Sequence, residues 1–246
     1  MPLTSHLLSS SPHSFSLATQ HSFLKRAGSG TLPASTLTSW LIQDRLYALS
    51  YVAFIGSLLA KAQLSAQSDR TSTIEWKIVD LLIDALVNIR REVGMFEDIL
   101  REHFDWGKGG EGDKVDEARP ETTVYQNLFK AAAAPDKDLL VGMTVLWATE
   151  KCYLEAWRHA KAQSPVKEQE QKTPKVLRDV LIPNWTDPEF EAFVDRIGAL
   201  TDEFAESYGF TRNERSRELH QCMVAWNQVV WAEEKFWPDV DEEVGN

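Results

Sequence analysis

The chain has 246 residues, of which 43% are hydrophobic and nine are Trp, so it carries enough apolar material for one packed domain. Its formal net charge of -11, from 37 acidic and 26 basic residues, argues against the clustered Lys and Arg that binding to a nucleic-acid backbone requires. We therefore expect a folded chain that does not bind nucleic acid.

The cysteine content and the apolar stretches indicate a compartment. Cys152 and Cys222 are too few for a disulfide framework in a chain of this size, which is typical of a reducing environment. We expect a cytoplasmic protein in which both thiols are small buried groups. The longest apolar stretch, residues 46–60, is about one helical turn short of a bilayer span. We interpret it as a core helix and expect no membrane partner.

The chain opens with a Ser-rich segment, residues 1–14, that contains no Lys or Arg and no continuous apolar run. A secretion signal needs both features, so we predict a flexible N-terminus here. A short helix follows over 16–26, and the Gly-Ser-Gly at 28–30 ends it. His21 lies in this helix.

Apolar periodicity predicts six further helices. The first begins near Pro33, Ser35 and Thr36. The other five cover residues 74–104, 121–133, 137–162, 187–207 and 212–237. Asp136 and Asp187 are expected as N-caps, the latter followed by Pro188. The polar segments 107–119 and 163–175 lack periodicity and are predicted loops.

No strand is predicted anywhere in the chain. Amphipathic helices must bury their apolar stripes against one another, so the sequence predicts an all-α, single-domain bundle of about seven helices. We place this domain at residues 15–238, with an acidic tail at 239–246. Ligand sites in such bundles lie between the helices.

An acid interrupts an aromatic stripe in the first long helix. Trp40, Asp44, Tyr47 and Tyr51 recur at intervals of four, three and four residues, so they share one helix face. Burying an unpaired carboxylate costs roughly a few kcal/mol, so Asp44 needs a partner. It either accepts hydrogen bonds from a bound heterocycle or forms a salt bridge with a neighbouring Arg or Lys.

The last helix carries a second acid of this kind. Glu233 shares a face with Trp237, four residues further on, whereas Glu234 and Lys235 can face water. A carboxylic acid between aromatic rings has a raised pKa, which suits proton donation to a leaving group near neutral pH. The alternative is a partly exposed acid without a chemical role.

A third acid stands in an aromatic stripe of the helix at 137–162, where Glu150, Tyr153 and Trp157 repeat at three- and four-residue spacing. They form either part of a site or an ordinary aromatic core with Glu150 at its edge. Cys152 points about 100° away from Tyr153 and has no evident cationic neighbour. We therefore do not expect it to be a nucleophile.

Metal and serine-hydrolase chemistry find no support in the sequence. Helical bundles often hold iron through paired Glu-x-x-His motifs, and this chain contains none. Glu155 and His159 stand four residues apart, but solvent exposure explains a single pair better. No Gly-x-Ser-x-Gly elbow occurs either. We expect no metal and no cofactor.

Several segments resemble the TenA/thiaminase II family, whose members share the haem-oxygenase-like helical fold. The most specific is Gln-Asp-x-x-Tyr at 43–47. The others are ATQHSFL at 18–24, GTLP at 30–33, PETTVY at 120–125, WTDPEF at 185–190 and the closing Glu-x-x-Phe-Trp at 233–237. The resemblance covers roughly residues 15–238 and implies the same fold.

The resemblance also implies a site for a small aminopyrimidine. Asp44 would anchor the ring, and Glu233 would be the general acid or base. The other implied substrate-binding residues are Tyr47, Tyr125, Tyr153, Trp185 and Phe236, of which Trp185 replaces a family tyrosine.

One departure from the family changes the expected mechanism. Aligning Tyr153 with the tyrosine that supports the nucleophile places Thr149 where thiaminase II proteins carry their cysteine. A second branch lacks this cysteine, uses a nearby glutamate, and is associated with hydrolysing aminopyrimidine breakdown products of thiamin. Glu150, beside Thr149, fits that role. Our hypothesis is a C–N hydrolase in which Glu150 and Glu233 activate water and protonate the departing amine.

Two other function classes stay open at this point. The chain is alternatively a non-catalytic member that keeps the pocket for binding an aminopyrimidine or for protein interaction. Haem binding is suggested only by fold analogy and by His21, which packing or local capping explains better. Members of the family commonly assemble, so the resemblance implies a homo-oligomer.

Overall fold

The computed structural model describes residues 1–64, 66, 72–107, 116–164, 175–208 and 217–240. The helices are α1 (Leu3–Ser10), α2 (Pro12–Thr19), α3 (Ser22–Ser29), α4 (Ala34–Leu59), α5 (Ile74–His103), α6 (Pro120–Ala132), α7 (Leu139–Ala162), α8 (Ile182–Asn184), α9 (Pro188–Ser207) and α10 (Arg217–Phe236), with a π-helix at Leu177–Leu181. These ranges contain no strand, which confirms the predicted all-α bundle. None of the described helices is long and apolar enough to cross a bilayer.

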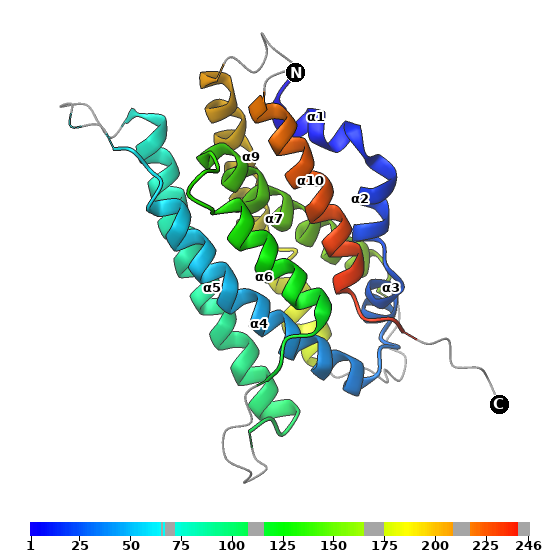
Figure 1. Ribbon diagram of the computed structural model, residues 1–246. Helices are drawn as coiled ribbons and strands as arrows, with labels where there is room; N and C mark the ends of the chain where they lie inside the picture. The colour runs from blue at the N-terminus through cyan, green and yellow to red at the C-terminus, as the bar shows by residue number, and fades with distance from the viewer. Residues whose placement is uncertain (65, 67–71, 108–115, 165–174, 209–216, 241–246) are drawn as a thin grey trace.

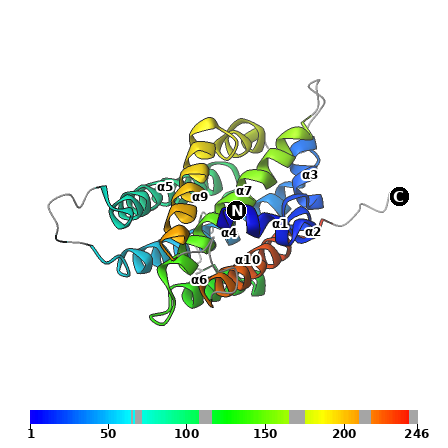
Figure 2. The same cartoon turned by 90° about the horizontal axis from the view of Figure 1, so that it is seen from above.

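Helix α7 lies at the centre of the bundle (Figures 1 and 2). Residues 139–149 are all buried, so the first half of this helix has no solvent face, as expected for a helix that others surround. It packs against α10, α9, α3 and α2, while α4 packs against α5 and α6. This arrangement turns the aromatic stripe of α4 and that of α7 toward the same interior space.

The N-terminal segment differs from the prediction. Residues 1–14 form α1 and the start of α2 instead of a flexible end. Leu3 and Leu7, four residues apart on one face of α1, are buried against the bundle. The backbone N–H and the hydroxyl of Thr4 donate to Asp202 of α9 at 2.8 and 2.7 Å. The Leu spacing was the available signal, and the Ser-rich composition obscured it.

The helix predicted over 16–26 is divided into α2 and α3. The side chain of His21 caps α3 by accepting a hydrogen bond from the N–H of Phe23 at 3.2 Å, which confirms a local role for this histidine. Helix α3 ends at Gly30, whose φ of 72° lies in the left-handed region that glycine adopts without strain.

The predicted caps fare differently. Asp187 accepts a hydrogen bond from the N–H of Phe190 at 2.7 Å and caps α9, as predicted. The prediction for Asp136 was wrong, because Asp138 caps α7 by accepting from the N–H of Leu140 at 2.8 Å. Residues 134–137 form a turn instead of the first helical turn.

Three predicted segments fall largely outside the described residues. They are the loops at 107–119 and 163–175, of which 108–115 and 165–174 are not described, and the acidic tail beyond residue 240.

Candidate active site

Asp44 of α4 points into the bundle and is 2% exposed. Its Oδ2 accepts a hydrogen bond from the hydroxyl of Tyr153 on α7 at 2.5 Å. Burial raises the pKa of Asp44 well above its ordinary value, the bond from Tyr153 opposes this, and nearby carboxyl groups raise it further. Within the described residues Asp44 pairs with a tyrosine and with no Arg or Lys, so the salt-bridge alternative is wrong.

Glu150 of α7 and Glu92 of α5 are partly buried. The hydroxyl of Tyr51 donates to Glu150, and the indole N–H of Trp185 donates to Glu92. Burial raises the pKa of Glu150 to about 8 and that of Glu92 to about 7, in each case against the lowering effect of the hydrogen bond. Both groups can therefore gain or lose a proton near neutral pH.

Glu233 of α10 is 2% exposed, and its Oε2 accepts a hydrogen bond from the hydroxyl of Tyr125 on α6 at 2.7 Å. Burial raises the pKa of Glu233 to about 8, and the charge of Glu150 adds to this. Glu234 instead pairs with Lys235 at 2.6 Å. The alternative of a partly exposed Glu233 is therefore excluded.

Asp44, Glu92, Glu150 and Glu233 form what we call the acid cluster. Each accepts a hydrogen bond from a tyrosine hydroxyl or an indole N–H, and none forms a salt bridge within the described ranges. Such donors satisfy a buried oxygen without bringing a positive charge, so they leave the pKa high. The arrangement supplies both protonated and ionised carboxyl groups near neutral pH.

Residues of the acid cluster line two adjacent cavities. The inner cavity, of about 20 Å³, is lined by Asp44, Tyr47, Ile89, Glu92, Phe96, Thr149, Glu150, Tyr153 and Trp185. The vestibule, of about 360 Å³, lies outside it, and its further lining includes Asn88, Met95, Asn184, Phe190 and Phe193. Ile89, Glu92, Glu150 and Trp185 line both hollows and therefore form the partition between them.

The predicted site residues divide into two groups. Asp44, Tyr47, Glu150, Tyr153 and Trp185 line the inner cavity. Tyr125, Glu233 and Phe236 do not line either hollow.

Tyr47 stands between the two groups. It lines the inner cavity, while its ring centroid is 4.9 Å from that of Tyr125 and 5.9 Å from that of Phe236. The Glu233–Tyr125 pair therefore lies behind Tyr47, one aromatic layer away from the cavity.

Glu92 is the site residue that the sequence analysis missed. Its position continues the apolar face of α5, since Ala85, Ile89, Phe96 and Ile99 are all buried at the spacing of that face. An acid in such a register is the same signal that drew attention to Asp44. It went unused because the surrounding helix is rich in charged residues.

Cys152 does not supply a nucleophile to the site. Cys152 is fully buried, and burial raises the pKa of its thiol well above the ordinary value, so it is unreactive. The hydroxyl of Thr149 donates to the main-chain oxygens of Val145 and Leu146 at 3.1 and 3.0 Å. The described parts of the chain contain no group of three or more His, Cys, Asp or Glu arranged to hold a metal ion.

The interior cavity of this helical bundle is bounded by aromatic rings and buried carboxyl groups. Such cavities are typical of proteins that bind small molecules in the core of a helical bundle. Comparison with known proteins then identifies the family. Residues 11–240 match the model of the TENA/THI-4/PQQC family, and the chain belongs to this family.

Relatives and solved structures agree with this assignment. A Glycine max protein named "Probable bifunctional TENA-E protein" is 23% identical over 89% of this chain and 85% of its own length. A Fusarium pseudograminearum protein named "Probable transcription factor" is 29% identical over 96% of this chain, which spans 51% of that relative. The chain thus covers only about half the length of the Fusarium protein.

The solved structures show the same fold. A TenA homologue from Pyrococcus furiosus has a TM-score of 0.73 at 21% identity and covers 96% of this chain and 98% of its own. A TenA family transcription regulator from Silicibacter sp. has a TM-score of 0.77 at 16% identity and covers 96% and 94%. The predicted haem-oxygenase-like TenA fold is therefore confirmed.

Proposed function

We propose that this chain hydrolyses a C–N bond of a small aminopyrimidine, either an amino or a formylamino derivative, and belongs to the branch of the family without the nucleophilic cysteine. Membership of the family supports a role in thiamin salvage. The observation that carries the proposal is that Asp44, Glu92 and Glu150 line one interior cavity with Tyr153 and Trp185.

Asp44 is the anchor for the ring. Tyr153 occupies Oδ2, which leaves Oδ1 for the amino group of an aminopyrimidine, and a protonated Asp44 donates to a ring nitrogen. Its raised pKa keeps a proton available for this second contact. The aromatic walls Tyr47 and Trp185 provide faces on which a flat ring packs.

Hydrolysis needs one ionised and one protonated carboxyl group. The ionised group takes a proton from water, whose oxygen bonds to the carbon that carries the departing nitrogen. As the C–N bond breaks, the protonated group donates its proton to the leaving amine. We assign these roles to Glu150, which lines the inner cavity, and to Glu233, which lies behind Tyr47 and reaches the substrate only when Tyr47 moves aside. Glu92 has the lowest pKa of the three, about 7, so it ionises first and competes for the role of base.

The substrate must widen the site before it reaches Asp44. An inner cavity of about 20 Å³ holds roughly one water molecule and not a ring. The vestibule, at about 360 Å³, has the size of a small-ligand pocket. Since Trp185 stands in the partition, its movement away from Glu92 would join the two hollows.

The test combines turnover with binding. Purified protein is incubated with a 5-aminomethyl-4-aminopyrimidine and its N-formyl derivative, and release of ammonia from the first or of formate from the second is followed together with the melting temperature. We expect product from the wild type and none from Asp44→Asn. Stabilisation without product from the wild type would instead favour the non-catalytic binding protein, and neither effect would reject the pocket assignment.

Location and assembly belong to the same proposal. We propose a cytoplasmic protein that forms homo-oligomers, in line with its two buried, free cysteines and with the habit of the family. Light scattering on the eluted protein measures the assembly directly. The chain spans about half the length of the Fusarium relative. The activity proposed here is therefore that of the matched segment.

A further inference from the structure

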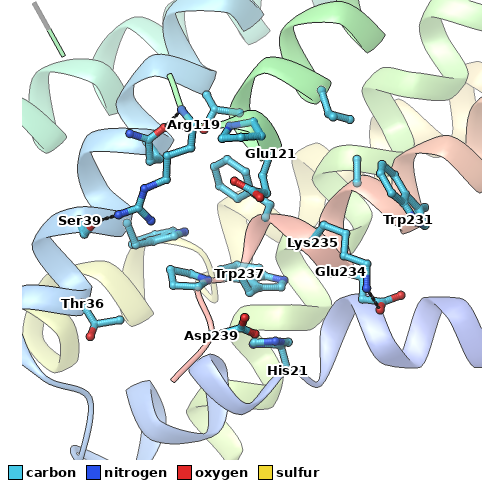
Figure 3. A pocket seen from close by; sticks show the side chains of 18 of the residues that line it. His21, Thr36, Ser39, Arg119, Glu121, Trp231, Glu234, Lys235, Trp237 and Asp239 are labelled. Carbon is cyan, nitrogen blue, oxygen red and sulfur yellow. Dashed lines mark hydrogen bonds and ion pairs between the residues drawn. The ribbon is translucent and has the colours of Figure 1, made fainter. Parts of the chain in front are cut away.

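A second and larger pocket lies apart from the acid cluster. It has a volume of about 910 Å³ and is formed by the first turns of α4 and α6 and by the end of α10 (Figure 3). It shares no lining residue with the inner cavity or the vestibule. We call it the α4–α6 pocket, and its size matches that of small-molecule sites.

A buried amide fixes the shape of this pocket. Gln43 is 8% exposed. Its side chain makes three hydrogen bonds to the segment that leads into α6. It donates to the main-chain oxygen of Glu117 at 3.1 Å and accepts from the N–H of Arg119 at 2.9 Å and the hydroxyl of Thr122 at 2.7 Å. Arg119 is therefore held at the rim by its own backbone.

One end of the pocket collects hydrogen-bond donors. The guanidinium of Arg119 donates to the hydroxyl of Ser39, and Thr36 lies on the same side (Figure 3). No side chain caps the N-terminus of α4, so the first-turn N–H groups beside Thr36 add partial positive charge there. Donors of this kind favour an oxyanion.

An independent observation also indicates a missing acceptor. Trp40 lines the pocket and is 0% exposed, and its indole N–H has no hydrogen-bond partner within the described residues. Buried donors are almost always paired, so an unpaired one is a sign that an acceptor belongs nearby. Because this N–H is fully covered in the structure, a ligand oxygen at the α4 end would pair with it only after the neighbouring side chains shift.

The rest of the lining sets the size and charge of the ligand. Trp231 is 52% exposed on one wall, and Trp237 forms part of the floor (Figure 3). Trp231 offers a ring face to a planar group, whereas the ring of Trp237 stacks on Phe23 and Trp40. Glu121 and Asp239 also line the pocket, while Glu234 is already paired with Lys235. These carboxylates disfavour a ligand with more than one negative charge.

We propose that the α4–α6 pocket is a second ligand site, which takes a small planar molecule carrying a single carboxylate. The carboxylate binds at Arg119, Ser39 and the first turn of α4, and the ring packs against Trp231. Phe236, one of the residues implied for the aminopyrimidine, also lines this pocket, but the pocket lies outside the inner cavity and the vestibule and does not depend on turnover there.

The test uses three probes that differ in one feature each. Phenylacetate carries a ring and one charge, phenylacetamide the same ring without the charge, and phenyl phosphate the ring with up to two charges. Titration calorimetry on the full chain should show saturable binding of phenylacetate and weaker binding of the other two. Preferred binding of phenyl phosphate would overturn the single-charge assignment.

Variants then locate the binding. Arg119→Gln should lower the affinity for phenylacetate about tenfold, the usual effect of losing a charge-assisted hydrogen bond. Arg119→Lys should lower this affinity by less. Arg90→Gln on the exposed surface of α5 is the matched control and should change nothing. Thermal melting of each variant checks that it is folded. Absence of saturable binding, or equal binding by Arg119→Gln and Arg90→Gln, overturns the proposal.

Discussion

Two glutamates on α5 show how the inside and the outside of this bundle treat the same side chain. Glu97 pairs with Arg45 at 2.9 Å and with Arg101 at 3.0 Å. Burial acts to raise its pKa, but these hydrogen bonds outweigh it and leave the pKa below the ordinary value. Glu92, five residues earlier, accepts from Trp185 and has a pKa raised to about 7. The depth of burial and the partner, and not the residue type, decide the charge.

Helix α7 repeats the comparison. Glu155 pairs with Lys151 and Arg158, at i-4 and i+3, through contacts of 2.7 and 3.0 Å. Glu150 has no cation at such positions and accepts from Tyr51 instead. A sequence rule follows for the positions three and four residues away on the helix. An acid with aromatic or aliphatic residues at these positions belongs to the interior cluster, and one with Lys or Arg there belongs to the outer ion pairs.

The largest effect should come from removing the ring anchor. Asp44→Asn keeps one oxygen as the acceptor for Tyr153, but its NH2 group replaces the second oxygen and cannot accept a hydrogen bond from the amino group of the substrate. We expect kcat/KM on the aminopyrimidine to fall about a thousandfold. Glu97→Gln is the control, because it makes the same carboxyl-to-amide change in the outer group. Equal losses in the two variants would break the distinction between the groups.

The next effect concerns the acid and the base. Glu150→Gln and Glu233→Gln should each lower kcat by about a hundredfold or more, because general acid–base catalysis contributes in that range. The double variant should lose little beyond the worse single variant, since the two groups act as a unit.

The pH profile assigns the base. If Glu92 is the base, Glu92→Gln removes the limb of kcat that rises near pH 7, whereas Glu150→Gln leaves it in place. A profile that is unaltered in both variants would mean that neither glutamate acts as the base.

The fold was accessible from the sequence because helix periodicity reports it directly. The stripes of α4, α7 and α10 placed Asp44, Glu150 and Glu233 correctly on interior faces. The short helix α1 was missed, since two leucines in a Ser-rich segment give little periodicity. The cap of α7 was misplaced because the turn at 134–137 depends on Lys61, whose Nζ donates to the main-chain oxygens of Ala134 and Lys137 from a distant segment.

The partners of the acids were the harder part. Each hydrogen bond in the cluster joins residues about a hundred positions apart, such as Tyr125 and Glu233 on α6 and α10. Periodicity fixes the face of one helix and not its rotation against another. The layer that Tyr47 places between Glu233 and the inner cavity was therefore beyond the reach of the sequence.

Stability should respond to pH in a way that reveals the interior acids. Glu150 has a folded-state pKa near 8 against an ordinary value of 4.5, so the folded chain binds more protons than the unfolded one between these values. Its contribution to stability is therefore lost as pH rises through this window. Glu150→Gln removes the titration and should raise the melting temperature at pH 8 by a few degrees, roughly 3 °C for each kcal/mol, with no gain at pH 4.

The outer acids should show the smallest effect and the opposite sign. The pKa of Glu97 is lowered by Arg45 and Arg101, so its stabilisation is present above pH 4.5 and is lost as pH falls through the folded-state value. Glu97→Gln should cost less than about 1 kcal/mol of unfolding free energy at pH 7 in urea titrations, and less still in high salt. If Glu97→Gln instead gained stability at pH 8, as expected for Glu150→Gln, the folded protein would also disfavour the ionised form of Glu97. The contrast between buried acids with aromatic partners and outer acids with cationic partners would then fail.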